Sequence, residues 1–352
     1  MENIGFDTKN GQVSPKDLIP GRVIAEYRGL YRVLTDLGEY NARITGKMYF
    51  NASEETYLPA VGDYVRLDMQ GGSEAVLREI LPRKSVFVRK AAGPISQSQT
   101  LAANFDYVFI VTSMNYDFNI GRLDRYVAIA WESGGIPVII LSKADLVEDR
   151  EGVINKVLEN YPGVAFHMTS NVTGEGMEEL REYFTGERTV VFLGSSGVGK
   201  SSLLNYLYGE ELMNVKNLRG NIDKGQHTTT HRQLVALPGG GNIIDTPGMR
   251  ELGLWHAGEG LDKGFSDIHD KIESLSQQCR FSDCKHGNEP GCAVRDALKM
   301  GELSAEQYER YRKLQREARH MERRISAKAR IDEHSKRKAF ARKIRNQKKV
   351  QW

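Results

Sequence analysis

The stretch Thr189–Ser202, TVVFLGSSGVGKSS, decides the fold of this chain. Its first five residues are apolar and rich in β-branched side chains, which is typical of a short buried strand. The next eight fit the pattern G-x-x-x-x-G-K-[ST] without a mismatch, and three leucines over 203–207 supply the apolar face of a following helix. A strand, a glycine-rich loop and a helix form a P-loop, whose backbone N–H groups surround a chain of phosphates. The alternative, a glycine-rich turn without a ligand, is disfavoured because a strand-like run precedes the loop and a helix-like run follows it.

Each part of this loop has an expected role. Lys200 should reach the outer phosphates, and the Ser201 hydroxyl should bind Mg²⁺. The predicted phosphate-binding residues are Gly194, Ser195, Ser196, Gly197, Val198, Gly199, Lys200, Ser201 and Ser202.

Strand-like and helix-like segments alternate around this loop. The predicted strands are 106–112, 137–141, 164–168, 189–193, 234–237 and 242–245, and the predicted helices outside the loop are 123–131, 153–160 and 176–184. Such alternation predicts a doubly wound, largely parallel α/β sheet, here over 105–256.

The N-terminal part has a different pattern. Residues 1–20 are polar and are expected to form a flexible arm. Over 21–89, strand-like runs at 22–25, 31–34, 40–44, 61–67, 75–80 and 86–89 alternate with turns, which predicts a small β-barrel, best matched by an OB-fold. Such barrels often bind single-stranded nucleic acid, but no aromatic platform is obvious, so a barrel used only for docking is an equal alternative. Residues 90–104 read as a linker.

All three cysteines of the chain lie close together. With one histidine they form the pattern C-x₄-C-x-H-x₅-C, from Cys279, Cys284, His286 and Cys292. Three thiolates and an imidazole can fill the four positions around a tetrahedral Zn²⁺, so we expect one structural zinc ion in a segment over 257–303. Free thiols beside a surface histidine are the alternative, which the use of every cysteine disfavours.

The C-terminal part, 304–352, combines an apolar stripe with strong positive charge. Ser304 and Gln307 form a capping-box start, and apolar residues follow at spacings of three and four at Tyr308, Tyr311, Leu314, Ala318, Met321, Ile325 and Ala329. From position 310 onward there are 17 Lys and Arg against 4 Asp and Glu, so this end carries +13 and the other 309 residues carry −10. A helix that docks on the body, followed by a tail that binds a polyanion, is expected.

Three further motifs indicate which nucleotide binds. Asp245 and Gly248 form D-x-x-G at the end of a strand, where the aspartate is expected to bind Mg²⁺ through water. Ser142-Lys143-Ala144-Asp145 resembles N-K-x-D, whose carboxylate accepts two N–H groups that guanine has and adenine lacks. Ser170-Asn171-Val172-Thr173 lies where S-A-x-T is expected. Ser142 in place of asparagine removes a side-chain amide near the base, and Asn171 in place of alanine matters less because the expected contact there is a backbone N–H.

The order of these motifs is unusual. The two guanine motifs precede the P-loop, whereas in ordinary P-loop GTPases they follow it. The chain therefore resembles the RsgA, or YjeQ, family of circularly permuted GTPases, which combine an OB barrel, a permuted GTPase domain, a zinc knuckle and a basic C-terminal helix. The family's switch sequence G-R-H-T-T-T is Gly225-Gln226-His227-Thr228-Thr229-Thr230 here, with Gln226 in place of arginine. The resemblance implies that one of the three threonines completes Mg²⁺ coordination, and Thr229 is the favoured one.

The resemblance also indicates the activity. It implies GTP hydrolysis stimulated by the small ribosomal subunit and a role in late maturation of that subunit, with contacts to ribosomal RNA. Met249 stands where many GTPases have a water-orienting glutamine, and His227 is the expected substitute. No arginine finger is evident in the sequence, so intrinsic turnover should be slow.

Two rival readings remain. One is an RNA-binding P-loop ATPase, and the other is an RNA-binding scaffold in which GTP is a structural or slow-switch ligand. We expect a monomer in the cytoplasm, since the chain has neither a membrane-length apolar run nor a signal-peptide pattern.

Overall fold

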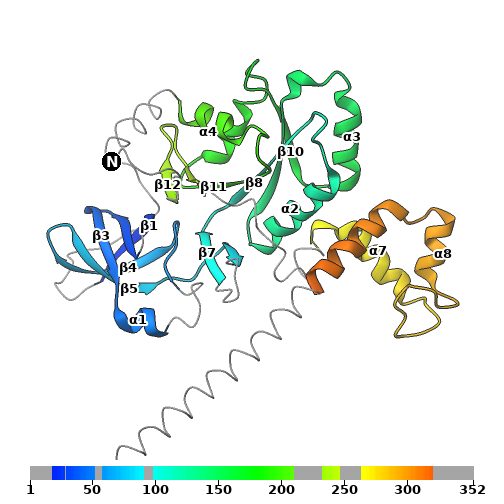
Figure 1. Ribbon diagram of the computed structural model, residues 1–352, viewed down its shortest axis with the longest axis horizontal. Coiled ribbons are helices and arrows are strands. Elements are labelled where there is room, and N and C mark those ends of the chain that lie inside the picture. Colours follow the sequence, from blue (N-terminus) through cyan, green and yellow to red (C-terminus); the bar gives the residue numbers. More distant parts are fainter. Residues whose placement is uncertain are drawn as a thin grey trace, which may run out of the picture. The chain divides into compact units, whose positions relative to one another are not determined.

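A computed structural model describes residues 18–27, 29–51, 58–90, 98–209, 232–245 and 263–319 (Figure 1). The chain divides into two compact units, Met1–Gly253 and Leu254–Trp352. The first contains a β-barrel and an α/β sheet, and the second contains helices and the cysteine cluster. The fold class predicted from the sequence is confirmed.

Five strands close the N-terminal barrel. They are β1 (Ile19–Tyr27), β2 (Leu30–Thr35), β3 (Gly38–Ile44), β4 (Tyr64–Gly71) and β5 (Glu74–Ile80). The order β1-β2-β3-β5-β4 returns to β1 through a β1–β4 pairing, so the sheet has no free edge at this point. Alternate residues fill the interior, which holds Val23, Tyr31, Val33, Ala42, Val65, Leu67, Ala75 and Leu77. A short helix, α1 (Gly46–Asn51), which the sequence did not predict, follows β3.

The prediction was wrong in two places next to the barrel. The run at 86–89 is not a barrel strand, because β6 (Val86–Lys90) pairs in a separate two-stranded sheet with β7 (Ser98–Ala103). That partner strand occupies much of the stretch predicted as a linker. Apart from Leu101, the residues of β7 are small or polar, so the sequence does not indicate a strand there. In the structure Leu101 and Ala102 are fully buried. Burial thus orders a segment whose composition suggested a loop.

The α/β sheet has the order β10-β9-β8-β11-β13-β12. Its strands are β8 (Tyr107–Ser113), β9 (Ile136–Ser142), β10 (Ala165–Thr169), β11 (Thr189–Leu193), β12 (Gln233–Ala236) and β13 (Asn242–Asp245). Every pairing is parallel except that between β12 and β13. The carboxyl ends of β9, β10, β11 and β13 therefore lie along one edge of the sheet.

Helices cover both faces of this sheet. α4 (Lys200–Tyr208) and a 3-10 helix, η3 (Glu179–Phe184), pack against one face, where Phe109, Val138 and Val190 belong to their apolar cluster. α2 (Ile120–Glu132) contacts β8 and β9, and α3 (Arg150–Asn160) follows β9. The helix predicted over 176–184 is instead a short 3-10 helix over its last six residues only. Strands buried on both faces read as continuous apolar runs, which explains why their positions were predictable.

The barrel and the sheet are joined at two strands of the sheet, β12 and β11, and β11 leads into the phosphate loop. β1 pairs with β12 at Ala25 and Gln233. The buried Arg22 donates from Nη2 to Thr189 Oγ1 at 2.8 Å and to the Asn104 carbonyl at 3.1 Å. Burial lowers the pKa of Arg22, and the nearby Tyr64, Asp106, Glu187 and Asp63 oppose this shift.

The second unit contains α7 (Ser266–Ser276), α8 (Ala293–Met300) and a helix over 305–319. The helix at 305 begins as predicted, because the Gln307 N–H donates to Ser304 Oγ at 3.3 Å. The predicted stripe is buried at Tyr308, Tyr311, Leu314 and Ala318. Its other predicted members, and the basic tail over 332–352, lie outside the described residues. Among the described helices, none has the length and apolarity needed to cross a bilayer.

Candidate functional site

The glycine-rich loop connects β11 to α4, as its sequence predicts. A side chain at Gly194 would place its Cβ 2.3 Å from the carbonyl oxygen of Val111, so only glycine fits there. Gly199, at the start of α4, has φ +98°, a backbone conformation that favours glycine. The Lys200 ammonium lies within the loop and donates to the carbonyl oxygens of Gly194, at 2.6 Å, and Ser195. The loop therefore has the backbone and the cation of a phosphate site.

The S-K-A-D segment contacts this loop although it lies more than fifty residues earlier in the chain. Ser142 is buried at the end of β9, and its Oγ lies 2.6 Å from the Val198 carbonyl oxygen. The Lys143 ammonium donates to the Gly197 carbonyl oxygen at 2.6 Å. The serine that replaces asparagine thus makes a polar contact with the phosphate loop. Both contacts are on the second half of the loop.

The other predicted guanine segment joins the same place. Ser170 follows β10, is fully buried and donates from Oγ to Asp145 Oδ1 at 2.5 Å. The N–H groups of Val172 and Thr173 donate to the same Ser170 oxygen at 3.2 Å. Asp145 lies in a short 3-10 helix over Ala144–Leu146, with Ala144 buried beside it. The serine therefore fixes the orientation of the carboxylate expected to read the base.

The other predicted residues of the nucleotide site lie in D-x-x-G, in the switch segment, in the first turn of α4 and in the loop after β10. The backbone of Asp245 ends β13, which runs beside β11, so D-x-x-G begins next to the loop. Gly248, Met249, Gln226, His227 and Thr229 lie outside the described residues. Ser201 and Ser202 occupy the first turn of α4, and Asn171 lies in the exposed part of its loop.

The cysteine cluster in the second unit is a candidate metal centre. One possible ligand atom from each of Cys279, Cys284, His286 and Cys292 lies within 4.8 Å of the others. His286 Nδ1 is 3.7 Å from Cys279 Sγ and 3.5 Å from Cys292 Sγ, and these two sulfurs are 4.0 Å apart. Such separations are close to the edges of a tetrahedron with bonds of about 2.3 Å to sulfur and about 2.0 Å to nitrogen. This group could hold a metal such as zinc.

A serine orients the histidine of this cluster. Ser276 Oγ donates to the Ile272 carbonyl oxygen at 2.5 Å, so it must accept its second hydrogen bond, from His286 Nε2, at 3.0 Å. A proton on Nε2 leaves Nδ1 free to bind a metal. Burial, and after it the Arg312 guanidinium, lowers the pKa of His286, which favours the neutral ligand form.

Sequence reasoning missed two features of the first unit. Arg122 on α2 donates to Ser195 Oγ of the phosphate loop at 2.8 Å, although it lies 73 positions earlier in the chain. Tyr49 and Phe50 on α1 expose 68% and 89% of their surface. Neither feature follows from a local pattern, because each depends on how distant segments pack.

Residues 80–255 match the family described as RsgA GTPase. The small ribosomal subunit biogenesis GTPase RsgA 2 of Lactiplantibacillus plantarum is 44% identical over 88% of this chain and 84% of its own length. RsgA 1 of Listeria innocua is 45% identical over 84% of this chain and 83% of its own.

Solved structures give the same result. YjeQ from Thermotoga maritima is 28% identical, with a TM-score of 0.61 over 84% of this chain and 97% of its own. YloQ, described as a circularly permuted GTPase, is 26% identical, with a TM-score of 0.61, and the match covers 88% of this chain and 98% of YloQ. The motif order, the five-stranded barrel, the Cys₃His cluster and these likenesses agree, and the chain belongs to the RsgA family of GTP-hydrolysing enzymes.

Proposed function

We propose that this chain hydrolyses GTP during late maturation of the small ribosomal subunit, and that the subunit stimulates the hydrolysis. The observation that carries the nucleotide part is the contact of Ser142 and Lys143 with the phosphate loop beside an Asp145 held by Ser170. The ribosomal part is supported by the relatives named small ribosomal subunit biogenesis GTPases. A protein that acts on the small ribosomal subunit is expected in the cytoplasm. We propose that this chain acts there as a monomer.

The proposed nucleotide site divides into three parts. Asp145 reads guanine, the loop from Gly194 to Ser202 holds the phosphates, and the switch supplies His227 to position the attacking water. Ser201, Thr229 and Asp245 offer hydroxyl and carboxylate oxygens, which are the ligands that Mg²⁺ prefers, so this donor set fits the ion. Bound there, Mg²⁺ would neutralise charge on the outer phosphates. In the second unit, the Cys₃His cluster would hold one structural Zn²⁺.

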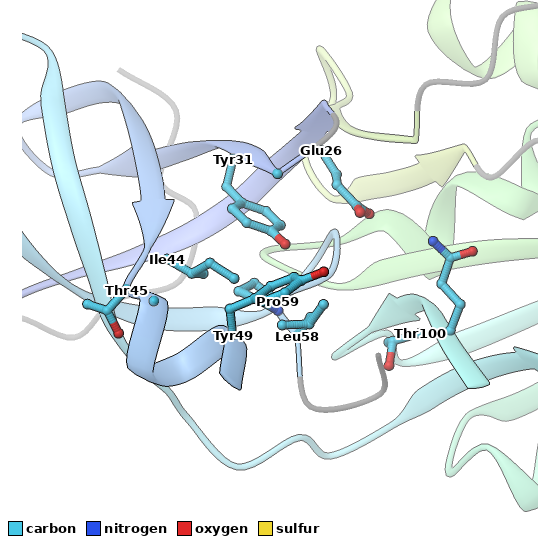
Figure 2. A pocket seen from close by; sticks show the side chains of 11 residues that line it. Glu26, Tyr31, Ile44, Thr45, Tyr49, Leu58, Pro59 and Thr100 are labelled. Atoms are coloured by element: carbon cyan, nitrogen blue, oxygen red, sulfur yellow. The ribbon is translucent and has the colours of Figure 1, made fainter. Parts of the chain in front are cut away.

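The barrel and the basic C-terminal end are the proposed contacts with ribosomal RNA. A pocket of about 530 Å³ lies beside the barrel, and Figure 2 shows Tyr31, Tyr49 and Leu58 among the residues that line it. The exposed rings of Tyr49 and Phe50 can stack on unpaired bases, which is how many barrels of this kind hold single strands. These rings favour an RNA contact over a barrel used only for docking.

A route for stimulation starts at the same pocket. Arg232, the first described residue after the switch region, bonds Glu26 Oε2 at 3.2 Å, Gln99 Oε1 at 2.9 Å and the Thr100 carbonyl oxygen at 3.3 Å. All three partners line the pocket, and Figure 2 labels Glu26 and Thr100 there. A ligand that binds in the pocket and moves these three partners would therefore also move Arg232, which follows the switch region closely in the chain.

Co-sedimentation with isolated ribosomal subunits tests the proposed partner. The protein, loaded with a non-hydrolysable GTP analogue, should pellet with small subunits and not with large ones. Its affinity should fall steeply as salt rises, because phosphate contacts release counterions. Equal binding to both subunits, or binding that salt leaves unchanged, would count against the proposal.

Removing the two exposed rings should weaken this binding. The double variant Tyr49→Ala/Phe50→Ala should lose about tenfold or more in affinity for small subunits, because one base stacked on a ring contributes about 1–3 kcal/mol. Leu37→Ala is the matched control, since Leu37 is also apolar, is 62% exposed and lies in the turn between β2 and β3 of the same barrel. The idea is wrong if both variants bind alike in the sedimentation assay.

A further inference from the structure

Arg122 is fixed at the start of α2 by both its backbone and its side chain. Its N–H donates to Asn119 Oδ1 at 2.8 Å, which caps the helix. Its guanidinium pairs through Nη2 with Asp117, at 2.9 Å from Oδ1 and also with the carbonyl oxygen. A second guanidinium nitrogen, Nη1, donates to Ser195 Oγ at 2.8 Å. The group is thus held against the phosphate loop by two anchors outside the loop.

Two cations meet at the same residue of the loop. Arg122 contacts the side chain of Ser195, and Lys200 contacts its carbonyl oxygen. In a P-loop the lysine reaches the outer phosphates, so a second cation on the same residue lies at the outer end of the phosphate chain. Ser142 and Lys143, from the guanine segment, instead contact Val198 and Gly197. The guanine base is therefore expected near the second half of the loop, at Gly197 and Val198. Arg122 lies beside the first half, at Ser195.

We propose that Arg122 is an arginine finger supplied by this chain itself, which donates from its guanidinium to the outermost phosphate of bound GTP. During hydrolysis, the water oxygen bonds to the γ-phosphorus while the bond to the β–γ bridging oxygen breaks. The electron pair of that bond leaves with GDP, and the protons of the water pass to the released phosphate. A planar guanidinium suits phosphate oxygens, and a cation placed here stabilises the charge that develops on them. The inference rests on the proposed nucleotide site.

The alternative is that Arg122 only ties the loop to α2, and the choice of variants separates the two roles. Arg122→Gln can still donate to Ser195 but has no charge, whereas Arg122→Ala loses both. Arg78→Ala is the control, since Arg78 pairs with Asp68 in the barrel with similar exposure, 44% against 30% for Arg122. Circular dichroism and thermal melting of each full-length variant show whether it is folded.

Affinities for GDP, for a non-hydrolysable GTP analogue and for GDP with aluminium fluoride should be measured beside single-turnover hydrolysis. We expect Arg122→Gln and Arg122→Ala to lower kcat by about a hundredfold or more, with GDP affinity within about threefold of the unmodified protein. Binding promoted by aluminium fluoride, which mimics the phosphate in transfer, should be lost in both.

These measurements distinguish an arginine finger from a tether and from the absence of a nucleotide site. If Arg122→Gln turns over normally, or if GDP and GTP affinities fall equally with kcat unchanged, the residue is a tether and the proposal is wrong. If the unmodified protein binds no guanine nucleotide at all, the proposed nucleotide site itself fails, which is a different result from failure of Arg122.

Discussion

Replacing Asp145 by asparagine should weaken GTP binding by about a thousandfold, because a site built to accept hydrogen bonds loses heavily when its partner is mismatched. The Asp145 carboxylate receives the Ser170 hydroxyl at 2.5 Å and has oxygen lone pairs left for the two N–H groups of guanine. An asparagine side chain instead has an NH₂ group beside its carbonyl oxygen, and this group can donate to the additional carbonyl of xanthine. The variant should therefore prefer XTP to GTP.

Competition binding with GTP, XTP and ATP measures this shift. Asp149→Asn is a suitable control, since Asp149 caps α3 four residues away by accepting from the Gly152 N–H, and asparagine caps helices equally well. Asp145 does not read the base if its asparagine variant binds GTP as tightly as the control. An ATP preference in the unmodified protein would instead favour the rival ATPase.

Removing a cysteine ligand should empty the metal centre and unfold its surroundings. Zinc binding in small zinc domains contributes about 10–16 kcal/mol, and here it would replace an apolar core too small to order 279–292. Cys292→Ala should act most strongly, because Cys292 is buried and precedes α8 directly. Metal analysis should find about one Zn²⁺ in the unmodified protein and little in the variant. Hydrogen exchange over 263–319 should rise.

The same experiment has internal controls. Ser276→Ala keeps all four ligands but removes the acceptor for His286 Nε2, so its zinc affinity should fall by about 10–100-fold while its fold persists. Basal GTP binding should persist in both variants, because the nucleotide segments belong to the other compact unit. Stimulation by the small subunit should be lost in Cys292→Ala. Freshly purified protein with well under one zinc ion per chain would refute the structural role.

The sheet and the phosphate loop were predictable because their signals are local. Strands such as Thr189–Leu193 are buried on both faces and read as unbroken apolar runs. The loop motif is contiguous, and its glycines are required by contacts of the backbone itself, as at Gly194. The sequence assigned Asp145 and Ser170 to two guanine motifs, and the structure brings these two residues together because parallel strands end at one edge of the sheet.

The features that the sequence did not predict depend on packing between distant segments. β7 was missed because Leu101 and Ala102 are ordered by burial and by pairing with β6, and not by any pattern of their own. The absence of an evident arginine finger was inferred without knowing that α2 brings Arg122 to Ser195. The substitution at Ser142 suggested only a loss, whereas its hydroxyl reaches the Val198 carbonyl oxygen. Residue identity alone does not contain these distances.

Release of phosphate from GTP, measured with and without isolated small ribosomal subunits, tests most directly whether this chain is a subunit-stimulated GTPase. The rate should be slow alone and should rise by at least about tenfold with small subunits, since partners commonly complete the sites of slow GTPases. Large subunits should have no effect. A rate that small subunits leave unchanged, in protein shown to bind both GTP and the subunit, would contradict the proposal and favour a scaffold in which GTP is a structural or slow-switch ligand.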